Sequence, residues 1–313
     1  MRTVHGRGPR RRRMKTCLIT GATSGIGRAT ACDLGWRGWR LLLTGRNEPA
    51  GRRLLAEIQR AFPGAPAEFF PADISELGAV RALATWVSNR TDRLDGLINN
   101  AGARFDHYGQ TTEGVERTFA TNHLGHFLLT SLLTDLVSAG AGGRIITLGS
   151  VAHRMARPTL GWNLGPAPYD GKVAYANAKL ACILFAKELA RCPAGQNVLA
   201  CAVDPGIVAT AFARNNGWLA WCKHRLYHRF KGNLISAAAG AAGVVHAATV
   251  EAARLKRGGY YHGDRLAEGS SATEDAALAQ ELWEASERLS GIHGRGGEVE
   301  RAGAARPQPP ARV

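Results

Sequence analysis

Short apolar runs alternate with amphipathic segments along most of this 313-residue chain. The runs have the near-continuous apolar character of strands that are buried on both faces of a sheet. We predict strands over residues 17–19, 39–44, 67–71, 94–98, 143–148, 197–203 and 259–262. Apolar residues recur at helical spacing between them, which predicts helices over residues 26–34, 48–61, 76–87, 113–137, 172–191, 236–254 and 276–289. The repeated strand-then-helix order predicts one doubly wound α/β domain, with a parallel sheet flanked by helices.

The net charge of +15 is unevenly distributed along the chain. Six arginines precede Met14, and the segment from Gly291 onward adds a net charge of two, so residues 14–290 carry about +7. A body of this charge is not typical of a nucleic-acid-binding domain, and we expect no nucleic-acid partner. We predict a disordered basic extension over residues 1–13, the folded domain over 14–290 and a disordered tail rich in Gly, Pro, Ala and Arg over 291–313. The alternative for the first segment is a tag for nucleic acid or an anionic membrane.

Other features of the sequence indicate the compartment. No stretch reaches the roughly 20 apolar residues of a membrane span, and no apolar stretch follows the N-terminal arginines as it would in a secretory signal. The six cysteines form no CxxC pair and read as small buried residues of a reduced compartment. We therefore expect a cytoplasmic protein with no metal site and no structural disulfide.

A glycine-rich turn follows the first predicted strand. Gly21, Gly25 and Gly27 are spaced G-x-x-x-G-x-G and lead into the first predicted helix. A strand, a glycine turn and a helix in this order present a helix N-terminus to a phosphate, which suits a dinucleotide cofactor. The alternative is a tight turn that any α/β protein could carry.

The end of the second strand bears on the choice of cofactor. An acidic side chain there would bind a ribose 2′-hydroxyl and repel a 2′-phosphate, but this strand ends Thr44-Gly45-Arg46. A guanidinium can pair bidentately with a phosphate, so Arg46 favours NADP(H) over NAD(H). The alternative is a solvated surface arginine.

A tyrosine and a lysine lie four residues apart in the predicted helix over 172–191. Residues at this spacing share a helix face, so the phenol of Tyr175 and the ammonium of Lys179 point the same way. A nearby ammonium lowers the pKa of a tyrosine from about 10 toward neutrality. That pair could supply a general acid for a carbonyl oxygen. An exposed helix pair is the alternative.

Together these motifs resemble the classical short-chain dehydrogenase/reductases over about residues 15–265, with their Rossmann fold. The matching segments are Thr20 to Gly27, Asp73-Ile74, Asn99 to Gly102, Asp204-Pro205-Gly206 and Thr210. The resemblance implies a catalytic tetrad of Asn122, Ser150, Tyr175 and Lys179. It implies that Tyr175 protonates the carbonyl oxygen of the substrate, or deprotonates the alcohol in the reverse reaction, and that Ser150 hydrogen-bonds that oxygen. It also implies that Lys179 holds the nicotinamide ribose and that Asn122 holds a water. It also implies cofactor contacts from Gly21, Thr23, Ser24, Gly25, Ile26, Gly27, Arg46, Asp73, Ile74, Asn100, Ala101, Gly102, Tyr175, Lys179, Pro205, Gly206, Val208 and Thr210.

The details resemble the retinol dehydrogenase-like branch of that family. The segment between Ser150 and Tyr175 is longer than in typical members, and the motifs at residues 121–127, 259–262 and 281–286 match this branch. The branch acts on retinoids, steroids and other lipophilic carbonyls or alcohols, often with NADP(H). Many members carry an N-terminal membrane anchor, which we do not expect in this chain. The family is commonly dimeric or tetrameric, which makes a homo-oligomer an expectation. No basic residue precedes Gly25, so the NADP(H) interpretation rests largely on Arg46.

The least regular segment, Ala211 to Ile235, follows the nicotinamide loop. Its aromatic and basic residues suit an amphipathic lid over an apolar substrate, or a peripheral membrane contact. A surface helix anchored by aromatics is the plainer alternative. We treat His153 and His262 as ordinary polar residues. Two other functions remain open: a light-dependent protochlorophyllide reductase-like enzyme, and a catalytically silent NADP(H)-binding regulator.

Overall fold

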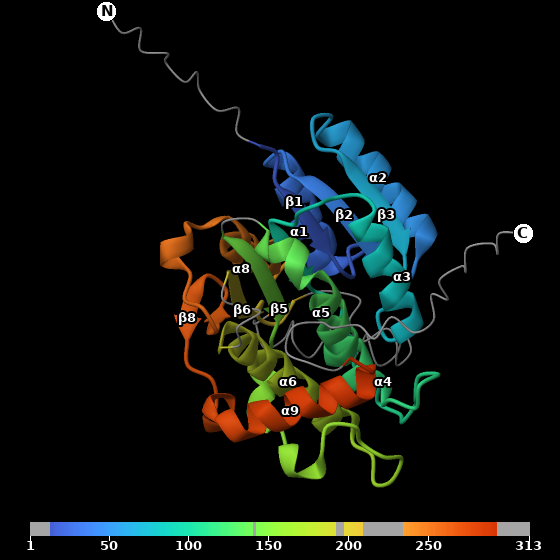
Figure 1. Ribbon diagram of the computed structural model, residues 1–313, viewed down its shortest axis with the longest axis vertical. Coiled ribbons are helices and arrows are strands. Elements are labelled where there is room, and N and C mark those ends of the chain that lie inside the picture. The colour runs from blue at the N-terminus through green and yellow to red at the C-terminus, as the bar shows by residue number, and fades with distance from the viewer. Residues whose placement is uncertain (1–12, 140–141, 192–196, 209–233, 293–313) are drawn as a thin grey trace, which may run out of the picture.

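An eight-stranded sheet forms the centre of the computed structural model, which describes residues 13–139, 142–191, 197–208 and 234–292 (Figure 1). Its strands are β1 Thr16–Ile19, β2 Arg40–Gly45, β3 Ala67–Pro71, β4 Gly96–Asn99, β5 Gly143–Leu148, β6 Val198–Asp204, β7 Gly259–His262 and β8 Arg265–Ala267. They are ordered β3-β2-β1-β4-β5-β6-β7-β8, and all neighbours are parallel except β7 and β8. The direction of winding reverses between β1 and β4, where open α/β sheets bind their ligands.

Alternate side chains of the strands enter two separate cores. Leu18 of β1 and Leu97 of β4 belong to the core on one face, whereas Ile19 and Ile98 belong to the core on the other. Both faces are therefore buried, which explains why the strands read as continuous apolar runs. The predicted doubly wound α/β fold is confirmed.

The helices divide between the two faces of the sheet. α1 Gly25–Trp36, α2 Glu48–Ala61 and α8 Ala237–Thr249 contribute to one core. α3 Leu77–Ser88, α5 Gly125–Ser138 and α6 Gly171–Arg191 contribute to the other, and α9 Ala276–Ser290 packs outside α5 and α6 (Figure 1). Among the described residues no helix has both the length and the apolar character that a membrane crossing needs.

The predicted helix over 113–137 is wrong at its start and in its middle. Helix begins only at α4 Arg117–Phe119, because the Glu116 carboxylate accepts the N–H groups of Thr118 at 2.7 Å and Phe119 at 2.8 Å and so caps the chain there. A π-helical segment, Ala120–Leu124, then separates α4 from α5. Such a segment holds an extra residue within the helix and is frequent at functional sites.

The end of the predicted helix over 236–254 also differs. α8 stops at Thr249, and the guanidinium of buried Arg144 donates hydrogen bonds to the carbonyl oxygens of Ala247 and Val250. These bonds satisfy carbonyl groups that a helix terminus leaves without partners. The short strand β8, absent from our predictions, follows β7 through a turn.

The segment between Ser150 and Tyr175 folds over the N-terminal half of α6. It contains two 3-10 turns, Val151–Met155 and Pro158–Leu160. The side-chain amide of Asn177 in α6 accepts the Arg157 N–H at 2.7 Å and donates to the Arg157 carbonyl at 3.1 Å. This two-way contact holds the longer segment against the helix that carries Tyr175 and Lys179.

Candidate active site

A cleft of about 950 Å³ opens at the carboxyl ends of the parallel strands. The turns after β1 to β6 and the start of α6 form its walls. Seventeen of the predicted site residues, from motifs spread across the chain, meet in this lining: Gly21, Thr23, Ser24, Gly25, Ile26, Arg46, Asp73, Ile74, Asn100, Ala101, Gly102, Ser150, Tyr175, Lys179, Pro205, Gly206 and Val208. Gly27 and Asn122 are not among the lining residues, and Thr210 lies outside the described residues.

The glycine turn fits a phosphate group. Gly21 and Gly25 have φ of +62° and +55°, a region that residues with a side chain rarely adopt. A Cβ on Gly27 would lie 2.4 Å from both the Gly21 carbonyl oxygen and the Asn100 side-chain nitrogen, so only glycine lets helix and turn approach this closely. Ser24 precedes α1 without a side-chain capping bond, and the first turn holds no acidic residue. The N–H groups of this helix end are therefore open to an anionic ligand.

Just after β2 and β3, Arg46 and Asp73 face each other in the lining of the cleft. The Arg46 Nη1 lies 3.6 Å from the Asp73 Oδ2, and their side chains are 52% and 35% exposed. The other carboxylate oxygen of Asp73 accepts hydrogen bonds from the Ser75 hydroxyl at 2.7 Å and the Ser75 N–H at 3.0 Å. Asp73 is thus held by its own turn, whereas the half-exposed guanidinium can reach an anion in the cleft.

Ser150, Tyr175 and Lys179 come together where β5 ends against α6. The ammonium nitrogen of Lys179 donates a hydrogen bond to the Leu148 carbonyl oxygen at 2.9 Å and lies 5.6 Å from the centre of the Tyr175 ring. A hydrogen bond with Ser150 and the charge of Lys179 both lower the pKa of Tyr175, but burial of the phenol has the larger effect and raises it. The predicted lowering of that pKa is therefore wrong for the protein alone, because the lysine only partly offsets desolvation.

Asn122 lies in the π-helical segment directly behind this group. Its side-chain nitrogen donates to the carbonyl oxygens of Ala103 at 2.6 Å and Thr118 at 2.7 Å. Its buried Oδ1 has no hydrogen-bond partner within the described part of the chain. A Cβ on Gly102 would lie 2.8 Å from that Oδ1 and 3.6 Å from the Lys179 ammonium, so both polar atoms border the same small space. Buried polar atoms are normally satisfied, and this one marks room for a donor such as water.

A buried histidine connects this region to the glycine turn, and we had not predicted it. The His126 Nδ1 lies 3.0 Å from the Asn122 carbonyl oxygen, and its Nε2 lies 2.9 Å from the Thr20 hydroxyl. Burial lowers the pKa of His126 to about 4, so the ring is neutral. Because a carbonyl can only accept, the proton sits on Nδ1 and the Thr20 hydroxyl donates to Nε2. That hydroxyl in turn accepts the N–H groups of Asn100 and Ala101, each at 2.9 Å.

His153 is also a positioning residue rather than an ordinary polar one. It is 1% exposed, and burial lowers its pKa. Its Nε2 accepts the Ser270 N–H at 3.0 Å, so its Nδ1 carries the proton and donates to the Ser150 carbonyl oxygen at 2.7 Å. The backbone of the candidate catalytic serine is thereby tied to the chain that follows β8.

The opposite wall of the cleft rests on buried Asp204. Its carboxylate accepts the Tyr260 hydroxyl at 3.1 Å and the Gly206 N–H at 2.9 Å, which fixes the turn after β6. The Tyr260 ring packs edge-on against His153, with ring centres 5.2 Å apart. Beyond this turn, Ile235 donates its N–H to the Ile207 carbonyl at 2.9 Å. The rest of the predicted lid, up to residue 233, lies outside the described residues, as do the predicted segments before residue 13 and after residue 292.

Comparisons with known proteins agree on one family. A family model described as "short chain dehydrogenase" matches residues 15–218. A Streptomyces sp. (strain C5) protein named "Putative daunorubicin C-13 ketoreductase DnrU" is 40% identical over 91% of this chain and 94% of its own length. Retinol dehydrogenase 11 of Homo sapiens is 32% identical, with 89% and 86% covered. The crystal structure of an uncharacterized protein from Mycobacterium Paratuberculosis matches 88% of this chain and 93% of its own at a TM-score of 0.69 and 30% identity.

Proposed function

This chain belongs to the short-chain dehydrogenase/reductase family, in its retinol dehydrogenase-like branch, and from that membership we propose that it transfers hydride between NADP(H) and a lipophilic aldehyde, ketone or alcohol. Membership makes it an oxidoreductase that acts on CH–OH or carbonyl groups. The observation that carries the proposal is the meeting of Ser150, Tyr175 and Lys179 in the same cleft as the open glycine turn. The names of the relatives, retinol dehydrogenase, polyprenol dehydrogenase and a ketoreductase, support an apolar substrate.

The residues of the cleft suit a nicotinamide dinucleotide. The N–H groups at the start of α1, beside Gly25 and Ile26, would hold the pyrophosphate, and Ile74 and Ala101 would border the adenosine. Pro205 and Gly206, fixed through Asp204, would border the nicotinamide. When bound, the nicotinamide supplies or accepts the hydride.

In this proposal the chain contributes a proton and an oriented substrate oxygen. Tyr175 donates its phenolic proton to the carbonyl oxygen during reduction and takes it back during oxidation. Ser150 hydrogen-bonds the same oxygen, and Lys179 stabilises the phenolate that forms. Asn122 holds a hydrogen-bond donor at its Oδ1, which has no partner among the described residues, beside the Lys179 ammonium.

Arg46 supports NADP(H) over NAD(H). It follows β2, where a carboxylate would bind the ribose 2′-hydroxyl, and its half-exposed guanidinium lines the cleft. With a 2′-phosphate bound, the Arg46 guanidinium would exchange its 3.6 Å contact with Asp73 for a bidentate contact with the phosphate.

The test is turnover of NADPH by the purified protein in the dark, with retinal, a medium-chain aldehyde and a steroid ketone as substrates. Tyr175→Phe should lower kcat by about 100-fold or more, since general acid catalysis contributes about 10²–10⁴-fold. Tyr108→Phe removes the same hydroxyl from a residue outside the cleft lining and should change kcat by less than about twofold.

The mutant protein should still bind NADPH, measured by the fluorescence of the nicotinamide. Wild-type turnover in Tyr175→Phe would contradict the proposed acid. NADPH binding without turnover on any of these carbonyls, with or without light, would favour the silent regulator, and turnover only in light would favour the pigment reductase.

A further inference from the structure

The charges at the substrate end of the cleft have one sign. Beside Ser150 and Tyr175 the lining includes Arg104, Arg154 and Lys172. Among the described lining residues, the one carboxylate is Asp73, which lies at the adenosine end and faces Arg46. A concave site lined by charges of one sign concentrates ligands of the opposite sign.

Two of these three cations are already held by protein groups. The Arg104 Nε lies 2.9 Å from the Asp106 Oδ1, in an ion pair that neutralises much of its charge. The Arg154 Nη2 donates to the Glu268 carbonyl oxygen at 2.7 Å, which fixes the guanidinium but leaves its charge in place.

Lys172 differs from both arginines. It is exposed in the first turn of α6, and the structure gives its ammonium no ion pair with the described residues. The nearest acidic residue in sequence, Asp170, accepts the Lys172 backbone N–H at 2.7 Å and caps the helix. Lys172 precedes Tyr175 by three residues, a spacing that places the two side chains on one helix face with Cβ atoms about 5–6 Å apart.

Apolar side chains at the same end of the cleft are unusually exposed. Val151 and Met155, on the 3-10 turn that follows Ser150, are 49% and 63% exposed and line the cleft beside Arg154. Exposed apolar groups grouped at a cleft mark a surface that a ligand covers. The substrate end therefore combines an apolar wall with a cation close to the candidate acid.

We infer that the substrate is an apolar carbonyl compound, or the matching alcohol, that carries a carboxylate, and that Lys172 binds this carboxylate while Val151 and Met155 cover the apolar body. This inference rests on the proposed function and adds a substrate class to it. The glycine turn that receives the cofactor phosphates lies after β1, so Lys172 remains available to the substrate when the cofactor is bound.

The test compares an ω-oxo decanoic acid with its methyl ester, which differ in charge and hardly in shape. With NADPH at neutral pH, kcat/KM of the wild-type protein should favour the acid by about fivefold, the upper range for one ion pair at an exposed site. The ratio should fall to about one in Lys172→Met and below one in Lys172→Glu, through KM for the acid. Added salt should reduce the wild-type ratio.

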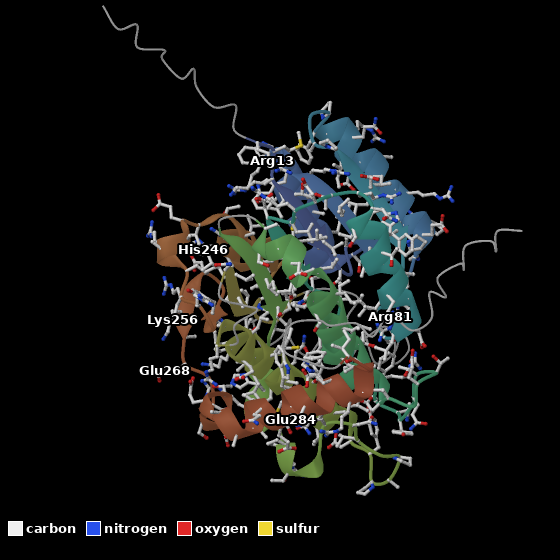
Figure 2. The ribbon with its side chains drawn as sticks, viewed as in Figure 1. Arg13, Arg81, His246, Lys256, Glu268 and Glu284 are labelled. Carbon is white, nitrogen blue, oxygen red and sulfur yellow. The ribbon has the colours of Figure 1, made fainter. Side chains whose placement is uncertain are left out.

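Lys256→Met is the matched control. Lys256 is an exposed lysine labelled beside the C-terminal strands in Figure 2, away from the residues that line the cleft. Its loss changes the net charge by the same amount as the loss of Lys172 and should leave the acid-to-ester ratio of kcat/KM unchanged. A wild-type ratio near one, or a ratio that persists in Lys172→Met, would overturn the inference while ester turnover upholds the proposed function. Absence of turnover with every carbonyl would instead overturn the proposed function, and the inference with it.

Discussion

Replacing Arg46 by leucine should shift the cofactor preference toward NADH. In the protein alone this guanidinium faces Asp73 at 3.6 Å, and its side chain lines the cleft and is 52% exposed. A 2′-phosphate would compete with Asp73 for the guanidinium. Without Arg46 the 2′-phosphate would face the negative charge of the Asp73 carboxylate with no cation between them, whereas a 2′-hydroxyl could donate a hydrogen bond to that carboxylate.

The size of the shift follows from the exposure of the pair. A hydrogen bond to a charged group contributes about 1.5–3 kcal/mol, and exposed ion pairs contribute about 0.2–1 kcal/mol. For a half-exposed guanidinium an intermediate value of about 1–2 kcal/mol is appropriate, which corresponds to about five- to thirtyfold in binding. We expect KM for NADPH to rise by that factor and KM for NADH to change by less than about twofold.

The assay is steady-state kinetics with both cofactors on one aldehyde, for wild type, Arg46→Leu and the control Arg52→Leu. Arg52 is 76% exposed on α2, where it pairs with Glu48, and is not among the cleft residues. Its loss should leave the NADPH-to-NADH ratio of kcat/KM unchanged. An unchanged ratio in Arg46→Leu, or an equal loss with both cofactors, would refute the assigned role.

Two further predictions concern the proton donor and the sheet. Because burial raises the pKa of Tyr175, its phenol stays protonated through neutral pH, and carbonyl reduction should be nearly independent of pH until that pKa is approached. Alcohol oxidation needs the phenolate, so its rate should rise with pH. An oxidation rate that is flat across the alkaline range would contradict this. Arg144→Met should lower the free energy of unfolding by about 2–4 kcal/mol in urea denaturation, because it leaves the last carbonyl groups of α8 without their charged donor. A loss below about 0.5 kcal/mol would show that water replaces the guanidinium.

Much of the sheet could be predicted from sequence because its strands are buried on both faces. Mostly apolar runs located β5 and β7 at their observed bounds, and β3 was also located at its observed bounds although it contains Glu68 and is only partly buried. The long helix over 113–137 was harder, since periodicity shows which residues face a core but not the hydrogen-bond register. The carboxylate of Glu116 and the π-helical segment set that register, and neither interrupts the apolar pattern.

At the candidate site, residues within short motifs could be located, but groups that act across the fold could not. His126 reaches Thr20 over 106 positions, and His153 meets Ser270 over 117. The direction of the Tyr175 pKa shift was predicted wrongly for a related reason. Its lysine is visible four residues away, whereas the desolvation that outweighs the lysine comes from packing of the whole cleft.

The π-helical segment at Ala120–Leu124 sets the spacing between Asn122 and α5, so this spacing is encoded by the number of residues in the segment. It is equivalent to one inserted residue, so deleting any single residue there would allow an ordinary helix from α4 into α5. The deletion would improve local hydrogen bonding, yet it would turn everything on one side by about 100° relative to the other. Asn122 and His126 could then no longer face Lys179 and Thr20 together. Selection acting on stability alone would tend to remove this residue, so its retention would indicate that the segment is kept for what the cleft does.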